Sequence, residues 1–401
     1  MRENAVITGC GAVTSVGTSA GVTWSAVRAG RSGIRTPAVA GAERPACRSV
    51  ARVSGIDADT LGVGARDAQI MGLPALMLLG SAREAMTEAR LDRAVCGSDE
   101  IGFYAGMGMV DPAPEDLRAA VLGSRRPDGI DYRRFFNDAY REIHPLWPLA
   151  MLNNVGFCLS ALLVGARGEN AVFSPGADSA LLALSEASDT VVSGRAAAAV
   201  AAGASERVSA ASVTRARIVG GWGEPECSCA PGECAAALVI ESADAARARG
   251  AAPLATVAGW GFSSASEGFA AAMTLAVERA SRAARPADAV LLHDERCRGT
   301  DMAEREAIAE VLGAQETPPV LLSSKELIGH GLAGGSATDV VLAVRMLVEG
   351  LLPATLARPA LACGRPGGAV PGWTAVRPRR IVVNSCSWSG SFGSVVLDVV
   401  E

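Results

Sequence analysis

Residues 171–184 read AVFSPGADSALLAL, and this stretch decides how the rest of the chain is interpreted. Its apolar start predicts a short strand, the proline and glycine that follow predict a tight turn, and the leucine-rich remainder predicts a helix. A residue at such a strand-to-helix junction lies at a helix N-terminus, where free N–H groups and the helix dipole favour negative charge. Many enzymes place a nucleophile there, because its pKa is lowered. Here the junction holds Ala177, which has no nucleophilic group.

The composition is that of an ordinary globular protein with a slight excess of acidic residues. The chain has 401 residues, of which 49% are hydrophobic and 20% are charged, and its formal net charge is -5. This length predicts two domains or one duplicated domain. No basic patch indicates a nucleic-acid partner, and no apolar run reaches the ~20 residues of a membrane span. The first residues lack a signal-peptide pattern, so we expect a cytoplasmic protein with neither a nucleic-acid nor a membrane partner.

The cysteines and glycines give no sign of a metal or a cofactor. The ten cysteines are scattered, and their spacing is not that of a disulfide framework in a chain of this size. Cys227, Cys229 and Cys234 form one group, which we interpret as a loop with incidental cysteines, because three thiols without a second Cys-x-x-Cys pair make a poor metal site. Gly9 and Gly11 follow a predicted strand, but their spacing is not that of a dinucleotide fingerprint.

Two residue counts single out side chains for a chemical role. The chain has three histidines, His144, His293 and His330, and a single lysine, Lys325, among 37 basic residues. Arginine cannot lose its proton or act as a compact point charge, so a lone lysine five residues before His330 is a candidate for a role that arginine cannot fill. The alternative is one lysine left by chance. For His144, which falls in a polar region, we expect a surface or packing role.

Predicted strands and helices alternate along the chain, which indicates the α/β class. They include a long helix at 68–89 and a strand at 289–293 that ends on a histidine. The halves 1–250 and 251–401 have a similar order of elements, and in each a helix of small residues follows a strand and a tight turn. We therefore expect a duplicated fold, with an insertion at about 111–148 carried on the first half.

The order and spacing of several motifs give the chain a resemblance to a known family. Residues 6–17 read VITGCGAVTSVG, Lys325 and Gly329-His330 form a Lys-x-x-x-Gly-His element, and residues 353–355 read Pro-Ala-Thr. From end to end the chain resembles the β-ketoacyl synthases of the thiolase fold, especially the ketosynthase-type subunits of type II polyketide and fatty acid systems. The resemblance implies two similar halves, each with a five-stranded mixed sheet, stacked as a five-layer α-β-α-β-α sandwich.

The resemblance also assigns active-site positions. The family's nucleophilic cysteine falls on Ala177, its two catalytic histidines fall on His293 and His330, and its lysine falls on Lys325. Its gating turn falls on residues 387–390, where Trp388 replaces the usual phenylalanine.

Other positions depart from the family pattern or have two interpretations. Asp294 and Glu295 replace a Gly-Thr pair after the first histidine, and we expect these carboxylates to have altered the pocket. Met107 and Met109 would line or cap the tunnel for a growing chain, whereas the alternative for both is a place in the core. Ser179 is a poor substitute nucleophile, because a serine there is more often a helix N-terminal residue that bonds the backbone.

Three functions remain open. The first is a non-condensing, chain-length-factor-like subunit that forms a heterodimer with a cysteine-bearing ketosynthase, through a strand at 171–173, and shapes the tunnel for a chain carried by an acyl carrier protein. The second is a malonyl-acyl-carrier-protein decarboxylase that polarises a thioester with His293 and His330. The third is a repurposed acyltransferase, hydrolase or cyclase. The missing nucleophile favours the first function, and the retained histidines favour the enzymatic ones.

Overall fold

The computed structural model of the protein describes residues 5–36, 49–91, 96–111, 114–174, 176–222, 227, 229–264, 266–280, 285–358 and 377–400. The main strands are β1 (Ala5–Thr14), β4 (Ile101–Met107), β7 (Asn170–Phe173), β8 (Ala198–Ala204), β9 (Cys234–Ser242), β10 (Ala255–Ser264), β11 (Ala289–Leu291), β12 (Val320–Leu322), β13 (Arg380–Cys386) and β14 (Ser391–Asp398). The longer helices of the body are α1 (Ala20–Arg28), α3 (Leu73–Glu88), α7 (Asn153–Val164), α8 (Ser179–Val192), α9 (Ala210–Gly220), α11 (Gly268–Ala280), α12 (Arg298–Leu312) and α14 (Ala333–Glu349).

These strands form one sheet in the order β12-β11-β13-β14-β10-β1-β9-β8-β4-β7. Its two ends repeat one pattern: β4 is parallel to β7 and β8, and β11 is parallel to β12 and β13. The pairs nearer the middle are antiparallel in both ends. The antiparallel pairing of β1 with β10, which sets Val6 opposite Thr256, joins the two five-stranded sets. The predicted pair of mixed sheets is confirmed, and the two sheets join edge to edge.

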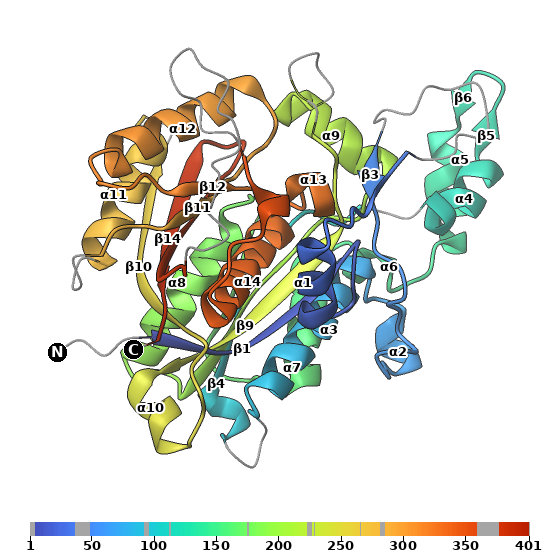
Figure 1. The fold of residues 1–401 in the computed structure, drawn as a ribbon. Helices are drawn as coiled ribbons and strands as arrows, with labels where there is room; N and C mark the ends of the chain where they lie inside the picture. Colours follow the sequence, from blue (N-terminus) through green and yellow to red (C-terminus); the bar gives the residue numbers. More distant parts are fainter. Residues whose placement is uncertain are drawn as a thin grey trace.

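The helices complete five layers (Figure 1). On one outer face α3 packs against α7 and covers β1, β9 and β8, and on the other α11 packs against α12 and covers β10 and β14. Between the two sets lie α8 and α14, which contact each other; α8 lies on β4 and β8, and α14 contacts β9 and β13. The helices that follow the two tight turns therefore run through the central layer, as predicted.

Apolar side chains and close backbone contacts hold the central layer together. Leu184 of α8, Leu342 of α14 and Val383 of β13 are fully buried in one cluster, and burial of each such side chain stabilises the fold by about 1.5–3 kcal/mol. The helix α14 also packs very close to β8. A side chain on Gly203 would place its Cβ 2.4 Å from the carbonyl oxygen of Ala333, so only glycine permits this contact.

Three predictions about element boundaries are wrong. Gly9 and Gly11, expected to follow a strand, lie inside β1, which continues to Thr14. The helix predicted at 68–89 is interrupted: the short α2 (Ala65–Ala68) ends first, and α3 begins at Leu73, after Gly72 and with Pro74 in its first turn. The strand predicted to end on His293 ends at Leu291, which leaves the histidine in the following loop. The division proposed at residue 250 falls between α10 (Ala243–Ala248) and β10.

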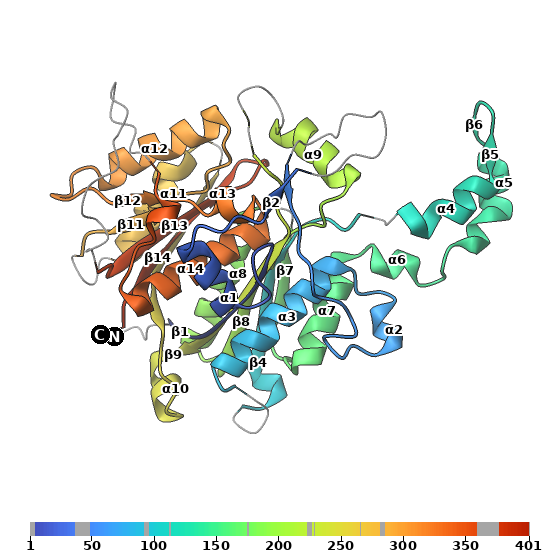
Figure 2. The ribbon, with the colours of Figure 1, turned by 45° about the vertical axis from the view of Figure 1, so that its right-hand side comes forward.

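The segment 111–148, predicted as an insertion, projects from the body (Figure 2). It contains α4 (Pro114–Gly123), the hairpin of β5 (Arg125–Arg126) and β6 (Gly129–Ile130), α5 (Tyr132–Asn137) and the start of α6 (Trp147–Ala150). Its base is anchored to α9, because Asp111 pairs with Arg215 at 3.1 Å and accepts a hydrogen bond from Ser209 at 2.8 Å. We call residues 114–142 the arm. Within the described residues, no helix is long and apolar enough to cross a membrane.

Candidate active site

The residue at the nucleophile position lies at the head of α8 and is buried. Ala177 is 2% exposed, and its carbonyl oxygen accepts a hydrogen bond from the hydroxyl of Ser336 in α14. The neighbouring polar groups are already engaged: Ser179 donates to the carbonyl of Gly176 at 2.5 Å, and Asp178 accepts from Ser391 at 2.7 Å. Burial raises the pKa of the Asp178 carboxyl. The side chains of Asp178 and Ser179, the two candidates to replace the nucleophile, are therefore used in hydrogen bonds that stabilise the turn.

The structure brings the two predicted histidines together. His293 lies in the loop after β11 and His330 in the loop before α14, and their ring centroids are 4.8 Å apart with an interplanar angle of 81°. Each is 3% exposed. Their separation of 37 positions in the sequence is closed by the parallel strands β11 and β12. The loop of His293 follows β11, and the loop of His330 follows the short helix α13 (Lys325–Ile328), which comes after β12.

Burial keeps both imidazoles neutral, and hydrogen bonds determine which nitrogen of each ring carries the proton. The backbone N–H of Cys386 donates to Nδ1 of His293 at 3.4 Å, and that of Leu332 donates to Nδ1 of His330 at 3.3 Å. Burial, reinforced by the charge of Lys325, lowers the pKa of His293 to about 3, and burial with His293 and Lys325 lowers that of His330 well below its usual value. Both rings are therefore neutral at pH 7, with the proton on Nε2. Neither Nε2 atom has a hydrogen-bond partner among the described residues.

The single lysine, Lys325, connects the segments that carry the two histidines. Lys325 is 4% exposed, forms an ion pair with Asp339 of α14, and donates to the carbonyl of Leu292 at 3.3 Å. The other carboxylate oxygen of Asp339 accepts from Ser324 at 2.6 Å. A compact ammonium group suits this enclosed position, where a planar guanidinium would need more room. Lys325 thus ties the loop of His293 to the helix that follows His330.

The carboxylates beside His293 are paired rather than directed at the imidazoles. Asp294 forms an ion pair with Arg358 at 3.3 Å. Glu304 accepts the backbone N–H of His293 at 3.0 Å, and burial raises its pKa to about 7. Glu295, which is 3% exposed, accepts the indole N–H of Trp222 at 2.8 Å and also that of Trp388. We expected Asp294 and Glu295 to have altered the pocket. The bonds of Glu295 to the two indoles are one such alteration.

Two tryptophans pack in series beside His330. Trp388 lies 5.3 Å from Trp222, and Trp222 lies 5.1 Å from His330, measured between ring centroids. One cavity beside His330 has a volume of about 30 Å³ and is lined by Trp222, His330, Leu332 and Trp388, with Ser205 and Val208 among the others. A water molecule needs about 10–15 Å³ of such space, so this cavity is large enough for one or two waters.

The cysteine interpretation needs a correction at this site. Cys227 and Cys297 form a disulfide between segments 70 positions apart, whereas the sequence had suggested incidental cysteines. The long separation hides such a pair from local spacing, because only the fold brings the segment after α9 against the start of α12. Cys229 and Cys234 are not part of the disulfide. Among the described residues, no group of three or more histidines, cysteines and carboxylates could hold a metal ion.

The two methionines lie in different surroundings. Met107, at the end of β4, is 1% exposed and belongs to the core cluster that includes Phe103 and Phe157. Met109 is 47% exposed, near the base of the arm. Their role in a tunnel remains a prediction, which depends on a second subunit to complete the wall.

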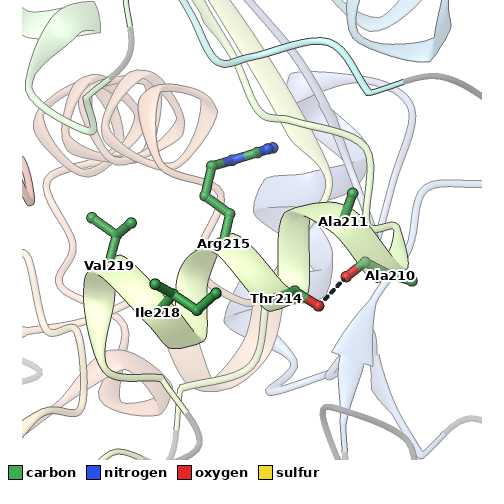
Figure 3. A pocket seen from close by; sticks show the side chains of 6 residues that line it. All are labelled: Ala210, Ala211, Thr214, Arg215, Ile218 and Val219. Atoms are coloured by element: carbon green, nitrogen blue, oxygen red, sulfur yellow. Dashed lines mark hydrogen bonds between the residues drawn. The ribbon is translucent and has the colours of Figure 1, made fainter.

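A wider hollow lies on the outer face of α9 (Figure 3). It has a volume of about 590 Å³ and is shallow, and its lining residues are Ala210, Ala211, Thr214, Arg215, Ile218 and Val219. The one ionisable group among these six is Arg215, which already pairs with Asp111 and Glu206. These six residues therefore provide neither a nucleophile nor a base, and the histidine pair remains the candidate centre.

Comparisons with known proteins agree with the geometry. The family model described as "Beta-ketoacyl synthase, N-terminal domain" matches residues 2–246, and "Beta-ketoacyl synthase, C-terminal domain" matches residues 255–358. Nodulation protein E of a Rhizobium species is 27% identical over 382 residues, with 88% of this chain and 89% of that protein covered. The 3-oxoacyl-[acyl-carrier-protein] synthase 2 of Vibrio cholerae is 26% identical, with 88% of each covered.

A solved structure extends this likeness to the fold. A chain of the ishigamide ketosynthase/chain length factor superposes with a TM-score of 0.79 at 21% identity, with 100% of both chains covered. At this identity the likeness carries the fold alone, and together with the family matches it confirms the predicted thiolase fold.

Proposed function

Because the chain belongs to the β-ketoacyl synthase family, we propose that it is a non-condensing subunit, similar to a chain length factor, that works as the partner of a cysteine-bearing ketosynthase. Condensation in this family proceeds through an acyl thioester on cysteine, and Ala177 cannot form one. The observation that carries the proposal is the state of the centre: the nucleophile is absent, Trp222 packs edge to face against His330, and Trp388 packs against Trp222. Loss of a covalent nucleophile removes many orders of magnitude in rate.

The surface supports a role in assembly. Five large apolar side chains are exposed on the arm, at 39–69% of their full area: Leu122, Ile130, Tyr132, Phe136 and Tyr140. Exposed apolar residues gathered on one projecting segment are typical of a surface that a partner covers. The strand β7 lies at one end of the sheet, where its free edge can pair with a strand of another chain. Arm and edge together offer a partner both apolar area and backbone hydrogen bonds.

Two relatives agree with the kind of partner proposed. One solved structure with the same fold is a ketosynthase/chain length factor, and one relative is named for its action on the acyl carrier protein. In this chain the corresponding partners would be a ketosynthase with an intact cysteine and an acyl carrier protein. The chain would then shape the tunnel in which a polyketide or fatty acyl chain grows. The proposed cellular setting is the cytoplasm.

The test of this proposal is co-expression with a ketosynthase-like protein that has an intact cysteine, taken from the neighbouring reading frames. We expect a stable heterodimer by light scattering, and condensing activity that is absent from either chain alone. The proposal fails if this chain remains a stable monomer in the presence of every such candidate, or if the ketosynthase makes the same products without it.

A second candidate function is supported by one specific observation. The Nε2–H groups of His293 and His330 are buried, close together and without a partner among the described residues, so they could polarise a thioester carbonyl. This arrangement favours decarboxylation of a malonyl group without condensation. The position of Trp222 counts against it, because this ring already packs edge to face against one of the two imidazoles, that of His330.

A further inference from the structure

The contact between the tryptophans and Glu295 lies against His330. One carboxylate oxygen of Glu295 accepts both indole N–H groups, and the other accepts the hydroxyl of Thr300 at 3.3 Å. This bonding fixes Trp222 edge to face against His330, and Trp388 edge to face against Trp222. We call Trp222, Glu295 and Trp388 the cover.

Each cysteine of the disulfide lies close in sequence to a residue of the cover. Cys227 follows Trp222 by five positions, and Cys297 follows Glu295 by two. Cys297 precedes the first turn of α12 and shares an apolar cluster with Trp222, to which Cys227 and Trp388 also belong. The covalent bond therefore joins the same two segments that the Trp222–Glu295 hydrogen bond joins.

The loop that presents Glu295 is held in an unfavourable backbone conformation. Asp294 and Arg296, on either side of it, have φ angles of 45° and 57°, in the left-handed region that non-glycine residues rarely occupy. Such a conformation persists only where surrounding contacts determine it. Here the contacts are the Asp294–Arg358 and Arg296–Glu326 ion pairs, at 3.3 and 2.9 Å, and the disulfide.

We propose that Cys227 and Cys297 are a reversible redox-modification site that locks the cover against His330, which in turn packs against His293. A dithiol reductant supplies two electrons and two protons: the S–S bond breaks, two thiols form, and the reductant becomes its own disulfide. Cys227 is only partly buried, so a small dithiol can reach the bond. Once the bond is broken, the Glu295 loop loses one of its constraints and the tryptophans can move from the imidazoles. This inference does not depend on the proposed function.

The chain's three histidines provide the readout. His144 is exposed, whereas His293 and His330 are each 3% exposed under the cover. The purified protein is treated with or without dithiothreitol, its thiols are blocked with iodoacetamide, and the reductant is removed. Diethyl pyrocarbonate, which modifies accessible neutral imidazoles, is then added, and peptide mass mapping measures each histidine. We expect modification of His293 and His330 to rise at least about tenfold after reduction, with His144 unchanged.

Variants and a thiol count make the result decisive. The double variant Cys227→Ser/Cys297→Ser should be labelled like the reduced protein without any reductant, whereas Cys158→Ser, at an exposed free cysteine, should behave like the wild type. If the double variant does not fold, the reduced wild type still gives the answer. Alkylation of the unreduced, unfolded chain should give two fewer adducts than alkylation of the reduced chain.

Equal protection of both histidines in the two redox states would overturn the inference, as would equal numbers of adducts. Neither result would bear on pairing with a ketosynthase, which light scattering measures separately.

Discussion

The histidine centre and the arm distribute their side chains in opposite ways. At the centre, the polar residues are sealed from solvent: His293, Lys325 and His330 are each at most 4% exposed. On the arm, aromatic residues face outward, with Tyr132 and Phe136 exposed by 69% and 68%. An enzyme that acts alone would open its polar centre to substrate and bury its aromatic residues. This contrast agrees with the proposed role of a partner subunit, in which the surface is functional and the centre is structural.

A similar contrast separates the two turns that lead into the central helices. Leu332, ahead of α14, has φ 48° and ψ −125°, and its N–H is bonded to His330. Ala177, ahead of α8, is not among the described non-glycine residues with positive φ. In the second half, the turn before α14 has a residue with positive φ, Leu332. In the first half, the corresponding turn before α8 has Ala177, which has neither a nucleophilic group nor a positive φ. The following variants test whether the centre is structural and the arm functional.

The largest effect is expected at the buried ion pair. Replacement Lys325→Met leaves Asp339, which is 1% exposed, without its counter-charge. The free energy of unfolding should fall by about 3–5 kcal/mol, measured by urea denaturation. The matched control is Arg247→Met, which breaks a pair whose side chains are 76% and 72% exposed and should change stability little. Equal losses in both variants would argue against a structural role for the centre.

The second effect concerns pH. Because burial lowers the pKa of His293 to about 3, the unfolded chain binds more protons than the folded one between that pH and about 6.5. Acidification from pH 6.5 to 5 should therefore cost the wild type about 1.5–2 kcal/mol more than the variant His293→Asn. Glu304, whose raised pKa acts in the opposite sense, is present in both proteins and cancels. The variant His144→Asn, at an exposed position, should follow the wild type. Parallel profiles of wild type and His293→Asn would show that this histidine is accessible.

The third effect is small for stability and large for assembly. Replacement of Tyr132 and Phe136 by serine should change the free energy of unfolding by less than about 0.5 kcal/mol, because both side chains are already in water. The same variant should lose the heterodimer in light scattering. Ile218→Ser is the control, since Ile218 is 79% exposed on α9, outside the arm. If it disrupts pairing as strongly as the arm variant does, the arm has no special role.

The smallest effect is expected from restoring the thiol. The variant Ala177→Cys should remain unacylated by an acyl carrier protein thioester in intact mass spectra. Ala177 is 2% exposed, so a thiol there would be enclosed. Cys386, whose backbone N–H bonds to His293, indicates how an enclosed thiol behaves in this centre: burial first, and then Glu295, raise its pKa far above the usual range. A double variant with Trp388→Phe would test the cover directly. Rapid acylation of the single variant would mean that the centre is open.

Sequence reasoning reached the parts of the molecule that depend on local pattern. Alternating strands and helices predicted the halves, and the Lys-x-x-x-Gly-His element placed Lys325 and His330 in one centre. It missed the contacts of Trp222 and the disulfide of Cys227, because both depend on how the segment after α9 packs against a loop some 70 positions away. Nothing in the spacing of these residues points to that contact. The cover could be identified only from the fold, whereas Lys325 and His330 could be identified from a sequence motif.

The central claim is that this chain carries no acyl chemistry of its own, and one measurement tests it most directly. The purified protein, alone, is incubated with malonyl-acyl carrier protein, and both carbon dioxide release and the mass of the carrier protein are followed. We predict no release above that of the carrier protein by itself, because Ala177 offers no nucleophile and both histidines are buried, with Trp222 packed against His330. Steady release that disappears in His293→Ala and in His330→Ala would contradict this account and establish a decarboxylase.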